Sequence, residues 1–215
     1  IVVDAPASPE ELAWALKNFA GIPRVGALYQ KVEYDFDSLQ GKPKKCDVAG
    51  WNLPNILRCG GICADQAYFT TTVAKALGIP AAYTSGYDAT SGHAWAGFVH
   101  GSGKKIAWDV EGRYDSYRGV TGRFANPQTG AFQADAVLPM LVQWGLEPRA
   151  DRVRASTLRV ADERVEDRMR MKGADIAALS ELREAMLAEA LRACPTDVRS
   201  WMQVRDLGKA GGLDA

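Results

Sequence analysis

The 215-residue chain contains a thiol, an imidazole and a carboxylate in an order that suits catalysis: Cys63, His93 and Asp109. A free thiol is mostly protonated at neutral pH. A cysteine that attacks carbonyl groups therefore needs a neighbouring imidazole, and it often lies at a helix N-terminus, where the thiolate is favoured. A carboxylate on the other ring nitrogen holds the tautomer that accepts the thiol proton. The three residue types thus indicate nucleophilic attack on an amide carbonyl.

The segment that follows the thiol is predicted to be one helix over 63–77, because apolar residues recur there at three- and four-residue spacing. Gly78 and Pro80 then provide a stop signal. Gly60 and Gly61 precede the helix and allow a sharp turn and the close approach of a substrate backbone. We expect the free N–H groups of the first turn to stabilise an oxyanion.

Three short runs rich in aromatic and β-branched residues follow, at 81–87, 94–100 and 105–109, separated by Gly, Ser and Asp. They predict consecutive antiparallel strands. His93 then opens the second strand and Asp109 ends the third. We therefore expect both side chains at one edge of the sheet, facing the helix tip.

This pattern resembles the transglutaminase-like superfamily of papain-type folds. The resemblance covers residues 46–115 and rests on a Gly-x-Cys helix at 61–63, a Gly-Ile-Pro-Ala turn at 78–81, a His-Ala-Trp strand at 93–95 and the Trp-Asp pair at 108–109. It implies that Cys63 is the nucleophile, His93 the general base and then acid, and Asp109 the orienting group. The superfamily includes cross-linking enzymes, peptidases, deamidases, amidases and inactive members, so the resemblance implies the chemistry more closely than the substrate.

Other residues compete for these roles. A cysteine in a helix is most often a small buried hydrophobe. His100 is the weaker base candidate, because an odd offset along a strand places it on the face opposite His93. Glu111 and Asp115 are nearby substitutes for Asp109, and the alternative role for Asp109 is to cap a turn.

The second oxyanion donor is not identified by any motif. The cleft residues that could donate are Trp51, Asn52 and Gln66. Asp65, in the first turn of the helix, has an ordinary role in complementing the helix dipole, and we assign it no catalytic one.

Composition agrees with a globular protein, with 47% hydrophobic residues, 24% charged residues and no net charge. No sustained basic patch of the kind that nucleic acid requires is present. No apolar run reaches the roughly 18 residues that span a bilayer, so neither nucleic acid nor a membrane is an expected partner. The chemistry needs no cofactor. Metal-ligand spacing and an EF-hand loop are both missing, so we expect neither a metal site nor calcium dependence.

The compartment stays open at this point. Cys46 and Cys59 flank a Gly- and Pro-containing stretch and either form a disulfide, which would indicate an oxidising compartment, or stay free like the other two cysteines. Residues 1–6 do not begin with Met and are compatible with a removed leader. This slightly favours a secreted or periplasmic location.

Outside the motif region, Ser8, Pro9 and Glu11 predict the start of a short helix that reaches Phe19. Alternating residues over 28–36 favour a strand, with a helix as the alternative. Residues 114–130 are rich in Gly, Arg, Asn and Ser and predict a long loop bordering the site.

The C-terminal part differs in composition, with many charged residues. The charged stretch 151–172 predicts a solvated helix or linker, 176–191 an amphipathic helix, and a further helix starts at Pro195. Residues 190–195 with Trp201 resemble the junction between two tetratricopeptide repeats. Because one repeat cannot bury its own face, these helices either pack on the preceding domain, which we favour, or begin a longer array.

We therefore predict an α+β fold with two parts. Residues 1–130 form a papain/transglutaminase-like core, in which the nucleophile helix packs on an antiparallel sheet, and residues 131–215 form a helical extension. The expected function is thiol-dependent acyl transfer on peptide or side-chain amide bonds, of the cysteine peptidase or amidase type. The alternatives are a protein-glutamine transamidase and a non-catalytic protein-binding module. The expected partner is a protein or peptide substrate, and the C-terminal helices are a candidate surface for another protein.

Overall fold

The structure is a computed structural model that describes residues 7–102, 105–171 and 173–210. The opening segment 1–6, on which the expectation of a removed leader rests, lies outside these residues. Two compact units are present, 1–136 and 137–215. The division falls six residues after the boundary expected at 130, because the last strand of the sheet, β5 (Phe132–Ala134), pairs with β4 (Arg123–Ala125) and so belongs to the first unit.

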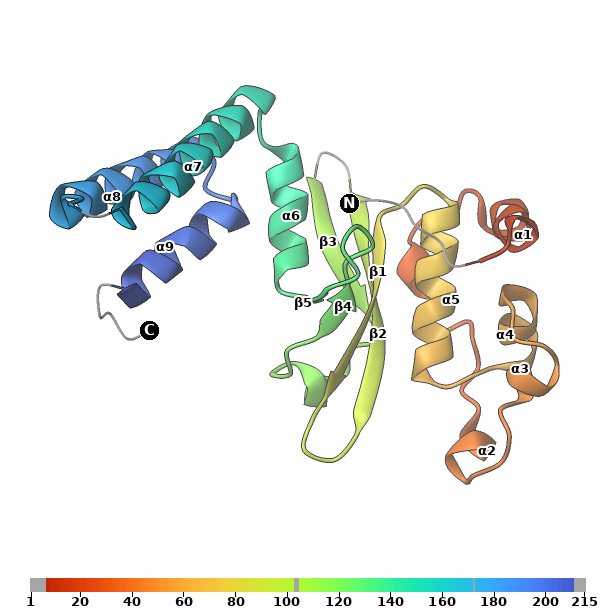
Figure 1. Ribbon diagram of the computed structural model, residues 1–215. Helices are drawn as coiled ribbons and strands as arrows, with labels where there is room; N and C mark the ends of the chain where they lie inside the picture. Colours follow the sequence, from red (N-terminus) through yellow and green to blue (C-terminus); the bar gives the residue numbers. More distant parts are fainter. Residues whose placement is uncertain (1–6, 103–104, 172, 211–215) are drawn as a thin grey trace. The chain divides into compact units, whose positions relative to one another are not determined.

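The first unit is built on a five-stranded antiparallel sheet in the order β3-β2-β1-β4-β5 (Figure 1). The central strands are β1 (Ala81–Tyr87), β2 (Gly92–Ser102) and β3 (Lys105–Glu111), which contain the three predicted strands. Residues 114–130, expected to be a loop, hold the 3-10 turn η2 (Asp115–Tyr117) and β4. The strand signal was missed there because β4 has only one buried side chain, that of Phe124.

A single helix, α5 (Cys63–Ala76), covers one face of β1 and β2, and α1 (Pro9–Phe19) and α4 (Leu53–Cys59) lie on its outer side (Figure 1). The main core forms between these layers. Phe69 and Val73 of α5 are fully buried against Phe98 of β2. The packing of the helix that begins at Cys63 on an antiparallel sheet is thus confirmed, and the fold is α+β.

The helix signals at the N-terminus also hold. Ser8 accepts a hydrogen bond from the Glu11 N–H, and the Glu11 carboxylate accepts one from the Ser8 N–H, which forms the capping box that the sequence predicts. The second carboxylate oxygen of Glu11 accepts the Leu53 N–H at 2.8 Å. The cap of α1 therefore also fixes the start of α4.

The strand predicted over 28–36 is wrong. The chain forms a 3-10 turn, η1 (Val25–Leu28), and two short helices, α2 (Phe36–Leu39) and α3 (Lys45–Val48). Leu28, Tyr29 and Val32 are completely buried, and their spacing of one and three residues belongs to consecutive turns. Alternating polar residues between them gave a false two-residue period.

The second unit consists of α6 (Val137–Leu146), α7 (Arg149–Met169), α8 (Ile176–Ala193) and α9 (Val198–Ala210). The charged stretch is therefore a helix, and α7 and α8 lie side by side along most of their length (Figure 1). The small buried side chains of Ala155, Ala190 and Cys194 allow this close approach. None of the helices in the described ranges is both long enough and apolar enough to cross a membrane.

Candidate functional site

Cys63 is the first residue of α5, and the turn before it depends on two glycines. Gly60 has φ +77°, and a Cβ there would lie 2.5 Å from the Glu33 carbonyl oxygen. A Cβ on Gly61 would meet Asp65 side-chain atoms at 2.4 Å. Both positions therefore need glycine because other groups of this chain, the Glu33 carbonyl and the Asp65 side chain, pack closely against them. The sequence had instead suggested that a substrate backbone approaches there.

The Asp65 side chain caps α5. Its carboxylate accepts the Ile62 N–H at 2.9 Å, the Trp51 indole N–H at 2.9 Å and the Lys44 ammonium at 3.0 Å, and Asp65 is only 2% exposed. The dipole role expected from the sequence is part of this arrangement. Its larger consequence is that one buried carboxylate ties the segment 44–51 to the turn that presents Cys63.

The thiol of Cys63 and the imidazole of His93 are neighbours, close enough for each to shift the pKa of the other. Burial raises the pKa of Cys63, but the hydrogen bond to His93, the N–H groups of Ala94 and Ala64 and the imidazolium charge outweigh burial, so the thiol pKa lies below its usual range. Burial lowers the pKa of His93, and the bonds to Cys63 and to the Gly112 carbonyl outweigh it in the raising direction. Both shifts favour a thiolate paired with an imidazolium.

The far side of the imidazole is held by main chain. Nε2 of His93 lies 2.5 Å from the carbonyl oxygen of Gly112. Since a carbonyl can only accept, Nε2 carries a proton and Nδ1 is left for the thiol. Gly112 takes φ +82°, and a Cβ there would overlap the Tyr29 ring at 2.2 Å. The position requires glycine on both grounds.

The expected contact between Asp109 and His93 is not formed and must be corrected. The Asp109 carboxylate pairs with the Arg24 guanidinium at 2.9 Å, and Arg24 also contacts Glu111. The reason is strand register. Asp109 lies opposite Phe98 in the β2–β3 ladder, so it is displaced by five residues along β2 from His93, or about 16 Å at the rise of a strand. The two substitutes also have other partners than His93: Glu111 pairs with Arg24, and Asp115 pairs with Arg118.

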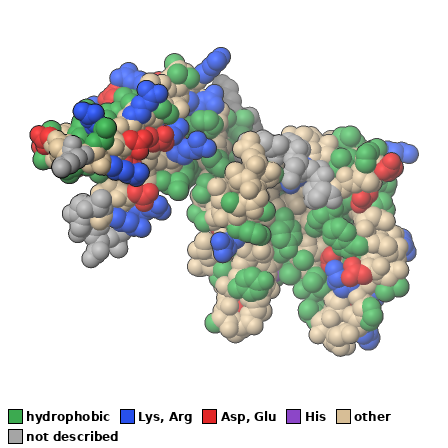
Figure 2. All heavy atoms as spheres, viewed as in Figure 1, with side chains coloured by type: hydrophobic (Ala, Val, Ile, Leu, Met, Phe, Trp, Pro, Cys, Tyr) green, Lys and Arg blue, Asp and Glu red, His purple; other side chains and the backbone are tan. Residues whose placement is uncertain are grey.

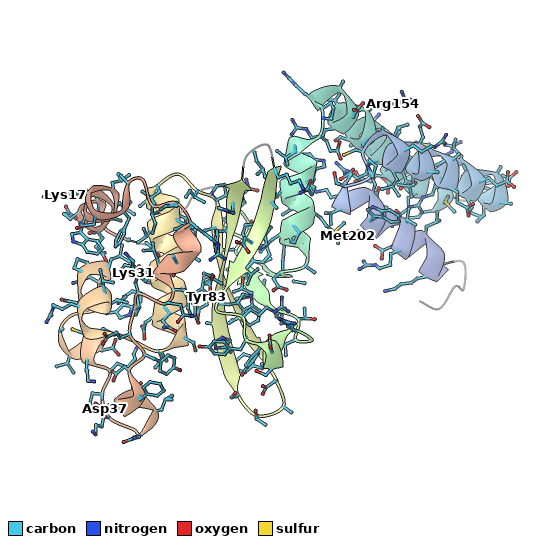
Figure 3. The ribbon with its side chains drawn as sticks, turned by 180° about the vertical axis from the view of Figure 1, so that it is seen from behind. Lys17, Lys31, Asp37, Tyr83, Arg154 and Met202 are labelled. Atoms are coloured by element: carbon cyan, nitrogen blue, oxygen red, sulfur yellow. The ribbon has the colours of Figure 1, made fainter. Side chains whose placement is uncertain are left out.

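Aromatic rings enclose the imidazole and the thiol. His93 stacks on Tyr114 with ring centroids 4.3 Å apart and also contacts Tyr117 at 4.8 Å. Four phenols lie near enough to the thiolate that its charge raises their pKa together with burial: Tyr29, Tyr34, Tyr83 and Tyr114. Tyr83, labelled in Figure 3, comes from β1, and its pKa is raised to about 12. These phenols stay protonated at neutral pH and can act as hydrogen-bond donors.

The three residues expected to donate to the oxyanion form hydrogen bonds with other groups of the protein. The indole N–H of Trp51 is held by Asp65 at 2.9 Å. Asn52 is the N-cap of α4 and accepts the Asn55 N–H. The Gln66 amide donates to the Val32 carbonyl at 2.8 Å, which ties α5 to the segment before α2. None of these polar groups has a described hydrogen bond to Cys63.

Tyr34 is a site residue that sequence reasoning missed. It lies close enough to Cys63 that burial and then the charge of the thiolate raise the pKa of its phenol. The strand mistakenly predicted over 28–36 hid it, because in a strand Tyr34 is one of several alternating residues. No local signal brings Tyr34 to the thiol, since the contact depends on a backbone bridge between Tyr34 and Gly61.

The surface of the first unit has a hollow beside the sheet (Figure 2). Figure 2 shows a notch between the sheet and the segments of α2 and α3, with hydrophobic side chains along it. The aromatic side chains of Trp51, Tyr87 and Tyr114 are 46%, 80% and 47% exposed and can contact a bound ligand. Among the described residues, no group of three or more His, Cys, Asp and Glu side chains is placed to hold a metal ion.

The four cysteines are free, so Cys46 and Cys59 are not bridged. Cys46 and Cys194 are buried, whereas Cys59 and Cys63 are partly accessible. Cys63 alone of the four has the imidazole beside it among the described contacts.

Comparison with known families identifies one match. Residues 16–110, which run from α1 to the end of β3, match the model of the transglutaminase-like superfamily. The comparisons with curated proteins and with solved structures gave no match. The matched span includes Cys63, His93 and Asp109, and ends before Gly112.

Proposed function

Since residues 16–110 match the model of the transglutaminase-like superfamily, we propose that the protein is a thiol-dependent acyl-transfer enzyme that acts on peptide or side-chain amide bonds. The observation that carries the proposal is the pairing of Cys63, at the start of α5, with His93, which lowers the pKa of the thiol and raises that of the imidazole. A buried cysteine without a catalytic role has no need of such a pair.

In the proposed reaction the Cys63 thiolate attacks the amide carbonyl, and the carbonyl π electrons move to oxygen. The oxyanion lies next to the N–H groups of the first turn of α5. The tetrahedral adduct then collapses, the C–N bond breaks, and His93 gives its proton to the departing amine. Water or a second amine resolves the thioester, which gives hydrolysis or transamidation. The Gly112 carbonyl keeps the imidazole in the required tautomer throughout.

Hydrolysis is the reaction that we favour, which would make the protein a cysteine peptidase or amidase. Transamidation needs a cleft that excludes water and admits a lysine amine. Trp51, Tyr87 and Tyr114 are exposed to solvent, so water has access to this part of the surface, which favours water as the second substrate. A protein or peptide is the proposed acyl donor, because an exposed surface can take an extended chain.

The test is iodoacetamide alkylation across pH, read cysteine by cysteine with peptide mass spectrometry. We expect Cys63 to react rapidly well below the usual thiol pKa of ~8.5, and to lose this reactivity in His93→Ala. His100→Ala is the matched control, because His100 is part of β2 yet has no described contact with the thiol. A Cys63 that titrates like a free thiol would instead favour a protein-binding module on a papain-like scaffold.

A second assay separates the reaction types. Dimethylcasein is incubated with the protein, with and without a fluorescent primary amine. Release of ammonia or of new N-termini indicates hydrolysis, whereas incorporation of the amine into casein indicates transamidation. Cys63→Ala should abolish either product while leaving the circular dichroism spectrum unchanged.

A further inference from the structure

The imidazole of His93 packs against the rings of two tyrosines from the segment that follows β3. The Tyr114 ring is stacked on it, with centroids 4.3 Å apart and an angle of 22° between the planes. The Tyr117 ring lies at 4.8 Å and is tilted by 40°. Tyr117 is buried, and its hydroxyl lies 2.7 Å from the Ser91 hydroxyl, whereas Tyr114 is 47% exposed. Tyr117 is therefore part of the core, and Tyr114 contacts the imidazole from the solvent side.

No carboxylate contacts the imidazole among the described interactions. The charged side chains on the segments packed around it form ion pairs with one another: Arg113 with Asp135, Asp115 with Arg118, and Asp65 with Lys44. Asp88, in the turn before β2, accepts the N–H groups of Thr90 and Ser91. Apart from the Cys63 thiolate, the groups that face an imidazolium here are thus uncharged: the Gly112 carbonyl and the aromatic rings.

We propose that Tyr114 is a positioning residue, whose ring face stabilises the imidazolium form of His93 and fixes the plane of the imidazole beside Cys63. This inference deepens the proposed acyl-transfer function and rests on it. The face of an aromatic ring carries negative potential and attracts a cation within about 6 Å of the ring centroid. The stacking distance of 4.3 Å lies inside this range. A parallel stack also resists rotation of the imidazole, because the turning ring would collide with the phenol.

The stack affects both proton transfers of the proposed reaction. Formation of the thiolate moves the Cys63 proton to His93, and the imidazolium later gives this proton to the departing amine. A ring that favours the charged imidazole increases the population of the ion pair, but it also makes the imidazolium a weaker acid. Because Tyr114 is half exposed, its attraction for the cation is small, which suits a group that must both accept and release a proton.

The test is the pKa of His93, measured by NMR on the full chain with labelled histidine. The chain has two histidines, so His100→Ala assigns the signals. The measurements are made in the Cys63→Ala background, where the titration belongs to the imidazole alone and not to a coupled pair. We expect Tyr114→Leu to lower the pKa of His93, with its dissociation constant rising about 2- to 10-fold. Tyr114→Phe should keep most of the wild-type value, because the ring face remains.

The sign of the change distinguishes attraction from shielding. If Tyr114 only kept water from the imidazole, its removal would hydrate the charged form, and the pKa of His93 would rise. A rise or no change in Tyr114→Leu would therefore overturn the proposal, as would an equal fall in Tyr114→Phe. Tyr87→Leu is the matched control, since Tyr87 is also an exposed tyrosine of the first unit but has no described ring contact with His93. A fall of the same size in Tyr87→Leu would also overturn the proposal.

Trifluorophenylalanine at position 114 provides the test if Tyr114→Leu does not fold. Fluorine withdraws electrons from the ring and weakens its negative face, while the shape stays close to that of phenylalanine. The pKa of His93 should then fall below its value in Tyr114→Phe, and equal values would overturn the proposal. The proposed function fails separately, if Cys63 of the chain with its native Tyr114 reacts with iodoacetamide like an ordinary thiol. That result leaves the pKa of His93 in the Cys63→Ala background unchanged.

Discussion

His93 is oriented by the backbone carbonyl of Gly112, with 2.5 Å between Nε2 and the oxygen, and not by a carboxylate. A carbonyl cannot ionise in the working pH range and it brings no net charge to the imidazole. The orienting bond therefore persists at acid pH, where a carboxylate would become protonated. The position of the carbonyl depends on a left-handed backbone conformation that only glycine adopts readily.

Asp109→Asn should leave the reactivity of Cys63 within about twofold of the wild type. The carboxylate contacts Arg24, which retains Glu111 as a second partner, and the Asp109 side chain is 36% exposed. A partly exposed ion pair contributes about 1 kcal/mol or less to stability. A carboxylate that orients a catalytic histidine is worth about 10⁴-fold in rate. The alkylation rate of Cys63 at neutral pH is the measurement.

Gly112→Ala provides the contrast. The added Cβ overlaps the Tyr29 ring, so the carbonyl must move away from His93. Rapid alkylation should be lost, and a folded fraction judged by circular dichroism separates this loss from unfolding. If Asp109→Asn slowed the reaction as strongly as His93→Ala, the carboxylate would be the orienting group after all.

The sequence was sufficient to predict elements whose signals are local. The capping box of Ser8 and Glu11 and the helix from Cys63 come from residues adjacent in the chain, and both form as expected. The proximity of Cys63 and His93 could also be predicted, because Cys63 is the first residue of α5 and His93 the second residue of β2, the strand that α5 covers.

What the sequence could not show depends on register and on long-range backbone contacts. A shift of a few residues between β2 and β3 decides whether Asp109 meets His93 or Arg24, and no side-chain pattern specifies that shift. Tyr34 reaches the thiol through a bridge to Gly61 across an irregular segment. Gly112 acts through its carbonyl, and the identity of a side chain says nothing of where a carbonyl points.

The cysteines should differ sharply in the pH at which they react. Burial and then the charge of Asp65 raise the pKa of Cys46 to about 11, whereas the pKa of Cys63 is lowered. A thiol with the lower pKa is deprotonated at the lower pH, so alkylation of Cys63 rises first and that of Cys46 begins only as the pH approaches 11. Iodoacetamide labelling of the folded protein followed by peptide mass spectrometry measures both. Equal labelling of the two at neutral pH would contradict the assigned environments.

Asp65→Asn should lower the free energy of unfolding by about 2 kcal/mol. The change keeps the shape of the side chain but leaves the Lys44 ammonium without its buried partner and replaces one acceptor oxygen with a donor. Chemical denaturation of the full chain is the measurement. Asp47→Asn is the control, since Asp47 also contacts Lys44, at 3.4 Å, but is 51% exposed and should matter by less than about 1 kcal/mol. If both changes lowered the free energy of unfolding equally, the buried Asp65 carboxylate would stabilise the protein no more than the exposed pair of Lys44 and Asp47 does.

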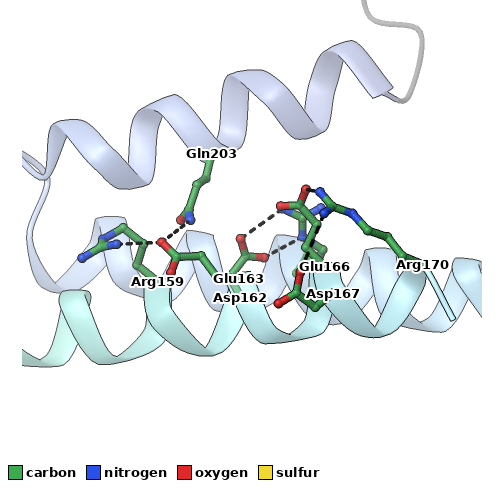
Figure 4. Close-up of polar contacts among 8 residues, drawn as sticks. Arg159, Asp162, Glu163, Glu166, Asp167, Arg170 and Gln203 are labelled. Atoms are coloured by element: carbon green, nitrogen blue, oxygen red, sulfur yellow. Dashed lines mark hydrogen bonds and ion pairs between the residues drawn. The ribbon is translucent and has the colours of Figure 1, made fainter. Parts of the chain in front are cut away.

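In the second unit, a buried ion pair joins α7 to α8. Arg183 donates to both carboxylate oxygens of Asp162, at 2.8 and 3.1 Å, and to Glu166 at 3.0 Å, and the Asp162 side chain is fully buried. Figure 4 shows Asp162 and Glu166 on the same helix, with the exposed Arg170 beside Glu166. Removing one partner of such a pair leaves an uncompensated buried charge.

Arg183→Met should therefore destabilise the unit by about 3–5 kcal/mol, and the double change with Asp162→Leu should recover most of the loss, because the remaining apolar side chains need no partner. Hydrogen exchange of the α8 amides in the full chain measures the local opening free energy. Arg170→Gln is the control: its pair with Glu166 is exposed, and its loss should cost less than about 1 kcal/mol. If the single and double changes opened α8 equally, the cost would lie in lost packing and not in the stranded Asp162 carboxylate.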